Sequence, residues 1–234
     1  MTDLASLRAR VRALEGAPAG TAGTVPLGVA ALDGVLPGGG LARGAVHEVV
    51  PRETGADDGP ATAFALTLAG RVLAASEGPV LWVTQAGDLY PPGAAAFGVP
   101  PHRLLCARAE GDAGVLWALE EALRCSALAA AVGEVEHLAR TPVRRLHLAA
   151  EAGGVTGLLC LRRRTPPTHA EPSAAATRWR VGARPRAAGE TGPRWHVELA
   201  RVRGGPPASV EVQWDETSGV FALAAPIRPG TAAG

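Results

Sequence analysis

The sequence contains no lysine, and all 23 residues counted as lysine or arginine are arginine. A phosphate-binding loop of an ATPase needs a lysine amine on the β- and γ-phosphates, beside backbone N–H groups and a Ser or Thr on magnesium. Arginine is a wide planar fork and replaces that compact charge poorly. We interpret the abundance of arginine as GC-rich coding bias, but this bias does not account for the loss of a lysine from such a loop.

Cysteine is also scarce: Cys106, Cys125 and Cys160 lie far apart, with no C-x-x-C spacing. This spacing excludes a disulfide framework and the usual zinc patterns, so we expect no metal site. The first residues do not resemble a signal peptide, and no apolar run reaches membrane-spanning length. The sequence therefore predicts a cytoplasmic protein with no membrane partner.

Charge is unevenly distributed along the chain. Residues 1–124 carry 9 Arg and 13 Asp or Glu, whereas residues 125–234 carry 14 Arg and 9 Asp or Glu. The basic second half is consistent with contact to nucleic acid or to an acidic partner, and equally with a solvated arginine-rich surface.

Apolar segments alternate between strand and helix patterns, which predicts βαβ units and a mostly parallel sheet. Residues 60–75 and 112–124 have helical spacing, and residues 195–202 and 210–214 predict an antiparallel C-terminal hairpin. We expect a core over residues 25–224, with an irregular Pro- and Arg-rich region over 165–193 that holds one strand near 178–181. Residues 225–234 are predicted to be a disordered tail. The other expected strands span residues 45–50, 80–84, 104–107, 128–132 and 155–161.

Residues 1–16 predict an amphipathic helix, followed by a flexible linker over 17–24. Leu4, Leu7, Val11 and Leu14 form its apolar stripe. This stripe packs either on the chain's own core or on another protein, and the linker favours docking on a partner.

The run P-L-G-V-A-A-L-D-G-V-L-P-G-G-G-L-A-R-G-A-V-H-E-V-V-P-R-E over residues 26–53 resembles the approach to the phosphate loop of RecA-like ATPases. The segments E-E-A-L-R-C at 120–125, R-R-L-H-L-A-A-E-A at 144–152 and T-R-W-R-V at 177–181 resemble ImuA-type proteins more closely. These are RecA-like accessory factors of bacterial damage tolerance. The resemblance covers about residues 24–223 and implies a RecA-like α/β fold.

In this alignment the catalytic elements of a RecA-like ATPase are absent. The phosphate-loop lysine falls at Asp57, or at Pro60 with a small insertion. The strand 128–132 ends at Gly133 rather than at a magnesium-directing Asp, with Glu134 expected on the opposite face, and the catalytic Glu falls near Ala86. We therefore expect no catalysis and no cofactor. The degenerate nucleotide loop consists of Glu53, Thr54, Gly55, Asp57, Asp58, Gly59 and Thr62.

The resemblance also locates two DNA-binding loops. The first is essentially deleted at residues 136–140, and the second corresponds to about residues 165–177. Basic side chains around the second loop are candidate phosphate contacts, and Trp179 is the one aromatic residue at its edge. The candidate DNA-contacting residues are Arg162, Arg163, Arg164, Arg178, Trp179 and Arg180.

The resemblance implies a non-catalytic adaptor in damage-induced, error-prone translesion DNA synthesis. The implied partners are an ImuB-like protein of the Y family, a DnaE-type error-prone polymerase and RecA, whose filament the N-terminal helix would cap. Two alternatives remain open, a degenerate but active DNA-dependent ATPase and a DNA-binding module.

Overall fold

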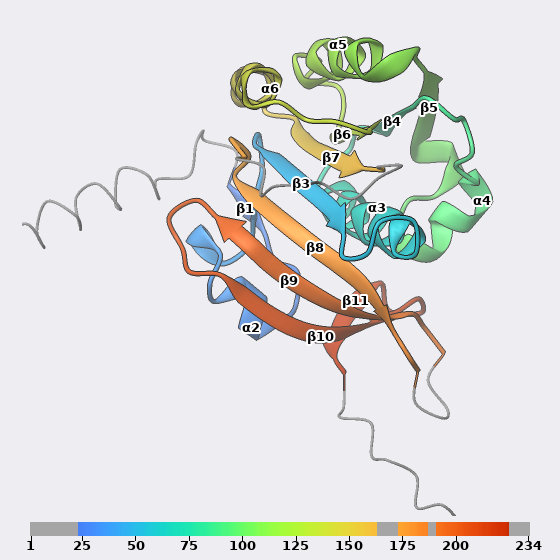
Figure 1. Cartoon of the computed structure of the whole chain (residues 1–234), viewed down its shortest axis with the longest axis vertical. Coiled ribbons are helices and arrows are strands. Elements are labelled where there is room, and N and C mark those ends of the chain that lie inside the picture. Colours follow the sequence, from blue (N-terminus) through green and yellow to red (C-terminus); the bar gives the residue numbers. More distant parts are fainter. Residues whose placement is uncertain (1–22, 163–172, 187–190, 225–234) are drawn as a thin grey trace, which may run out of the picture.

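A nine-stranded mixed sheet runs through the computed structural model, which describes residues 23–162, 173–186 and 191–224 (Figure 1). Its strand order is β11-β10-β9-β8-β3-β7-β6-β4-β5. Neighbouring strands from β8 to β5 are parallel, and those from β8 to β11 are antiparallel. The strands are β3 (Val46–Pro51), β4 (Val80–Thr84), β5 (Leu104–Arg108), β6 (Ala130–Val135), β7 (Thr156–Leu161), β8 (Thr177–Arg184), β9 (Arg194–Val202), β10 (Ala208–Asp215) and β11 (Val220–Leu223).

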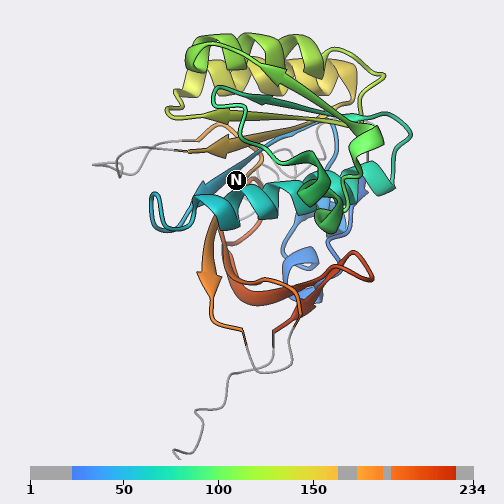
Figure 2. The same ribbon diagram turned by 90° about the vertical axis from the view of Figure 1, so that its right-hand side faces the viewer.

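This topology confirms the predicted α/β class, the mostly parallel sheet and the antiparallel strands at its C-terminal end. Helix α3 (Asp58–Ala74) packs on one face of the sheet, and α5 (Gly111–Leu123) and α6 (Arg140–Gly153) cover the other (Figure 2). Strands β6 and β7 are buried along their whole length because helices lie on both faces.

Shorter elements complete the molecule. A two-stranded sheet joins β1 (Thr24–Val25) to β2 (Leu41–Ala42), with α2 (Ala30–Asp33) and the 3-10 turn η1 (Pro37–Gly39) between them. On the far side, α4 (Pro91–Ala94) and the 3-10 turns η2 (Ala95–Phe97) and η3 (Pro101–Arg103) lead into β5. The Phe97 carbonyl oxygen approaches α3 at Gly70, where an added Cβ would lie 2.4 Å from it.

Each face of the sheet has its own core. The core under α3 is aromatic and centres on Phe64, whose ring lies 5.6 Å from Trp179, 6.0 Å from Trp195 and 5.6 Å from Phe221 between centroids. The core under α5 and α6 is aliphatic. Because the three antiparallel strands supply much of the aromatic core, they are part of the fold rather than an appendage.

Two strands differ from the sequence expectation. Strand β6 spans residues 130–135, so it continues past Gly133, where the expected strand ended. Within the region expected to be irregular, β8 occupies residues 177–184, more than the short strand expected near 178–181. It alternates between Thr177, Trp179 and Val181, which are buried, and arginines on the outer face; the arginine-rich composition obscured this period of two.

In the described part of the chain, no helix has the length and apolar character needed to cross a bilayer. Among the same residues, no group of three or more His, Cys, Asp or Glu is placed to hold a metal ion. The predicted helix over residues 1–16, most of the linker over 17–24 and the tail over 225–234 lie outside the described residues.

Candidate functional site

The loop between β3 and α3 corresponds to the predicted degenerate nucleotide loop, and its own carboxylates occupy its backbone donors. The Glu53 N–H donates to Asp57 Oδ2 at 3.0 Å, and the Gly55 N–H donates to Asp58 Oδ1 at 3.2 Å. A phosphate-binding loop leaves such N–H groups free to face the ligand. Here two anions of the protein itself occupy the positions of phosphate oxygens.

Asp57 also joins this loop to the sheet. Its Oδ1 accepts a hydrogen bond from the Ala183 N–H of β8 at 2.8 Å, and the residue is 8% exposed. Gly182 permits this approach, since an added Cβ would lie 3.1 Å from Asp57 Oδ2. Sequence reasoning treated Asp57 as a charge facing the phosphates, whereas the structure turns its carboxylate toward β8.

The carboxylate of Glu134 lies on the α3 side of the sheet, and here the expectation from the sequence was wrong in detail. Gly133 faces Val115 and Leu119 of α5, so Glu134 points to the face that carries the nucleotide loop. Its Oε1 accepts a hydrogen bond from Trp82 Nε1 at 3.2 Å, and its Oε2 accepts one from the Thr84 hydroxyl at 2.8 Å.

A guanidinium completes the environment of this carboxylate. Arg162, the first residue after β7, contacts Glu134 Oε2 at 3.1 Å and forms a fork with both oxygens of Asp88 at 2.9 and 3.0 Å. The hydrogen bond to Asp88 raises the pKa of the Arg162 guanidinium above its ordinary value, and Arg162 in turn lowers the pKa of Asp88. The protein thus places its own cation beside the carboxylate at the end of β6.

These groups surround an open hollow of about 220 Å³ at the carboxyl end of the parallel strands. Its lining contains three carboxylates and one cation, and the lysine that would hold phosphates is absent from the sequence. Magnesium nucleotide does not fit this chemistry, because its triphosphate would meet carboxylates and occupied N–H groups. The lining residues are Asp58, Gln85, Ala86, Glu134, Val135, Glu136 and Arg162.

The remaining residues of the predicted loop are dispersed. Glu53 and Gly55 are exposed, and Thr54 is half-buried. Gly59 and Thr62 line a neighbouring hollow of about 280 Å³ between α3 and α4. The Thr62 side chain hydrogen-bonds the thiol of Cys160, whose pKa burial raises to about 12. The structure therefore does not gather these residues around one ligand position.

The candidate DNA contacts also separate. Trp179 is 0% exposed and packs on Phe64, so the expectation that it contacts nucleic acid was wrong. Arg178 forms an ion pair with buried Glu48 at 2.6 Å, and Arg180 pairs with Glu198 at 3.3 Å on the open face. Arg162 belongs to the cluster with Glu134 and Asp88.

Other predicted site residues lie outside the described part of the chain. These are Arg163 and Arg164 beside the second loop, and the apolar stripe of Leu4, Leu7, Val11 and Leu14. Sequence reasoning missed the joint role of Arg162, Glu134 and Asp88. The only available signal was that an arginine and a carboxylate each end a buried apolar strand.

The comparisons with known proteins agree with this description. No family model matches the chain. Two curated relatives are described as "Protein ImuA", one from Caulobacter vibrioides strain NA1000 / CB15N and one from strain ATCC 19089 / CIP 103742 / CB 15. Each is 39% identical over 216 residues, which cover 85% of this chain and 87% of the relative. The resemblance inferred from the sequence is confirmed, and the chain belongs to the ImuA family.

Proposed function

We propose that this protein is a non-catalytic, RecA-like adaptor in damage-induced, error-prone translesion DNA synthesis, and that it binds an ImuB-like protein of the Y family. Membership of the ImuA family supports the cellular context. The observation that supports a non-catalytic role is the ion-pair cluster of Arg162, Glu134 and Asp88, together with the loop N–H groups bonded to Asp57 and Asp58. A DnaE-type polymerase and RecA are the further partners that we propose.

The ordering of this site supports a fixed rather than a cycling molecule. In a nucleotide switch, the loop N–H groups and the carboxylate at the strand end exchange partners as the nucleotide binds and leaves. Here each has a partner within the chain, so no nucleotide is required to order the loop. A scaffold for other proteins needs this kind of constant shape more than it needs a ligand.

The test is co-purification with the ImuB homologue of the same organism. We expect the two chains, co-expressed with a tag on the ImuB homologue alone, to elute together in size-exclusion chromatography. A tagged protein of similar size and charge serves as the control. Separate elution at micromolar concentrations of both chains would contradict the proposal. ATP hydrolysis by the purified chain, lost on a substitution of Asp58 or Gly59, would contradict its non-catalytic part.

A further inference from the structure

Five arginines from three elements lie close together along the side of α6 that faces β8 and β9. We refer to them as the arginine cluster: Arg140 and Arg144 of α6, Arg178 of β8, Arg201 of β9 and Arg203 just after β9. Arg178 and Arg201 are directly paired across the two strands. Arg203 Nη1 lies 3.1 Å from His147 Nε2, which places it against α6.

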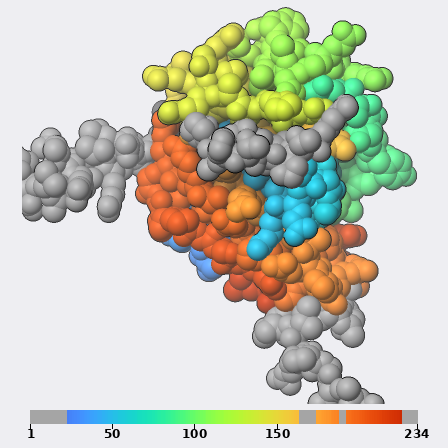
Figure 3. All heavy atoms as spheres, viewed as in Figure 1, coloured from blue at the N-terminus to red at the C-terminus, as the bar shows by residue number. Residues whose placement is uncertain are grey.

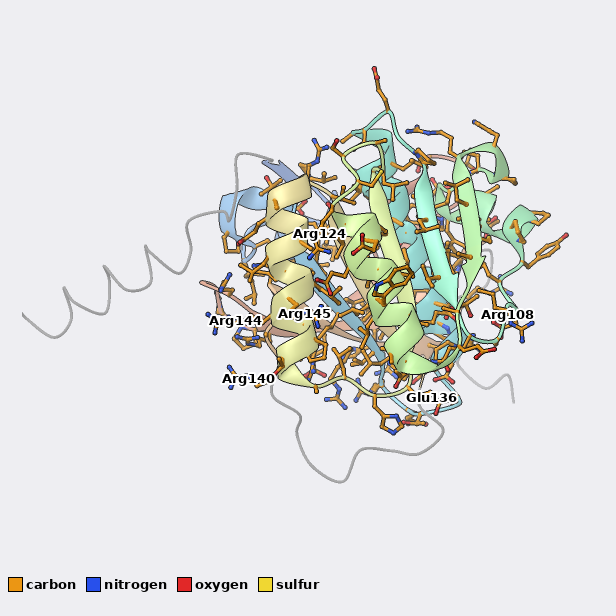
Figure 4. All side chains as sticks on the ribbon, turned by 90° about the horizontal axis from the view of Figure 1, so that it is seen from above. Arg108, Arg124, Glu136, Arg140, Arg144 and Arg145 are labelled. Carbon is orange, nitrogen blue, oxygen red and sulfur yellow. The ribbon has the colours of Figure 1, made fainter. Side chains whose placement is uncertain are left out.

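The two α6 arginines belong to the same side of the helix as His147. Residues 140, 144 and 147 are three and four positions apart, so their side chains are neighbours along one helical face. Figure 4 shows Arg140 and Arg144 on the side of α6 away from α5, whereas Arg145 and Arg124 lie toward α5. In Figure 3, the orange and red atoms of β8 and β9 lie at the surface beside the yellow atoms of α6.

Carboxylates near the cluster do not balance its charge. Glu48 is fully buried beneath Arg178, and Glu151 lies 3.4 Å from His147 rather than beside an arginine. The first turn of α6 contains no acidic residue. Burial lowers the pKa of Arg201; Glu48 raises it, and the charges of Arg203, Arg178 and Arg140 lower it further. Like charges held this close destabilise the fold, which favours a role for the cluster in binding an anion.

The ligand chemistry follows from the side chains present. Guanidinium groups bind phosphate oxygens with two parallel hydrogen bonds, and Arg140, Arg144, Arg201 and Arg203 are all exposed. Arg140 and Arg144 differ by about 6 Å along the helix, and neighbouring strands are about 5 Å apart, so the cluster extends beyond a single phosphate. The exposed tryptophan, Trp117, lies on α5 outside the cluster, and the other four tryptophans are buried.

We propose that the arginine cluster is a binding site for the phosphate backbone of nucleic acid, read without base stacking or sequence preference. An acidic protein segment is a poorer fit, because protein interfaces depend on aromatic and apolar anchors at their centre. The proposal does not depend on the ImuB interaction. It also differs from the sequence prediction, since Trp179 is buried and the site follows α6 rather than a loop.

The experiment measures anisotropy of a fluorescein-labelled oligothymidine of about 20 nucleotides, longer than most single-strand sites. The test variant is R140Q/R144Q. The control is R108Q/R124Q, which removes the same charge from exposed arginines on β5 and after α5 (Figure 4). We expect salt-dependent binding by the wild-type chain. The test variant should bind several-fold more weakly, and its slope of log affinity against log salt should fall by about 1.4 for two lost contacts. The control should match the wild type.

Each other outcome overturns the proposal. No salt-dependent binding by the wild-type chain at about 50 mM salt would do so, as would equal losses in the two variants. Polyglutamate that binds as tightly and with the same sensitivity to R140Q/R144Q would assign the cluster to an acidic protein segment. Displacement by low millimolar inorganic phosphate would assign it to a small phosphate ligand. Circular dichroism of both variants verifies that the fold is retained.

Discussion

At the scale of single residues, Arg162 decides the chemistry at the carboxyl end of β6. Glu134 is 5% exposed and would be an uncompensated buried anion without a cation nearby. Arg162 is less buried, since 32% of its side chain is exposed, and it also reaches the exposed Asp88. One guanidinium therefore joins the strand ends of β6 and β7 to the segment that follows β4.

We expect the substitution R162M to lower the free energy of unfolding by about 2 kcal/mol, because it leaves the Glu134 charge buried without its cation. The double variant R162M/E134Q should recover part of this loss. A neutral glutamine has no charge to compensate, and its carbonyl oxygen still accepts a hydrogen bond from Trp82 or Thr84. Urea unfolding of the wild type and the single and double variants gives the comparison. Equal losses in the single and double variants would show that charge burial is not the cause.

His47 predicts a pH dependence of stability. It lies in β3 with 0% exposure, and its ring nitrogens lie 2.8 Å from the Thr177 hydroxyl and 2.8 Å from the Ala42 carbonyl oxygen. Burial lowers its pKa from 6.5 to about 4, with a smaller contribution from His147. The unfolded chain therefore takes up a proton first as the pH falls, so stability decreases between about pH 6.5 and pH 4.

The expected loss from His47 is about 2 kcal/mol between pH 7 and pH 5. Urea unfolding at the two pH values measures it. The variant H47Q, whose amide keeps both a donor and an acceptor, should show a smaller pH dependence over this range. An unchanged pH dependence in H47Q would assign the effect to other groups, of which His147 is the first, because burial also lowers its pKa.

At the scale of elements, the strands differ in how well their sequences predict them. Residues 80–84 are continuously apolar, and β4 has these bounds. In β6 a glycine and a glutamate interrupt the apolar run, so the sequence-based boundary fell three residues short at its C-terminal end. The partners that make Glu134 acceptable in a strand, Trp82, Thr84 and Arg162, are 28 or more positions away. No local pattern encodes them.

The aromatic core under α3 makes an element-scale prediction. Phe64 of α3 contacts the rings of Trp179 on β8 and Trp195 on β9, so it joins the helix to both kinds of strand. We expect F64A to lower the free energy of unfolding by about 3–5 kcal/mol, because the cavity cannot collapse between rigid rings. F97A is the matched control, since Phe97 is only half-buried and should give a smaller loss. Equal losses would contradict this role for Phe64.

At the scale of the whole molecule, the sheet joins two regions of different character. The parallel strands carry the loop and the ion-pair cluster, whereas β8 to β10 carry arginines on the open face and tryptophans underneath. The sequence predicted the class of this fold, because strand and helix periods are local. It did not predict that β8 lies between β3 and β9, since that pairing depends on buried partners from distant segments.

The filled nucleotide loop leads to a prediction for the whole molecule. A ligand present at about 100 times its Kd stabilises a protein by about 2.7 kcal/mol, which is readily measured as a rise in Tm. We expect magnesium ATP at millimolar concentration to leave the Tm of this chain unchanged. Its phosphates would have to displace Asp57 and Asp58 from the loop N–H groups, without a lysine to compensate.

The variant D58N sharpens this experiment. It removes one anion from the hollow and keeps an oxygen that accepts the Gly55 N–H, so the loop geometry should persist. If charge alone prevented nucleotide binding, D58N would gain a rise in Tm with magnesium ATP. We expect no rise, because the Glu53 N–H stays bonded to Asp57 and Arg162 stays paired with Glu134. A rise in the wild type, or a large one in D58N, would show that the loop remains a nucleotide site.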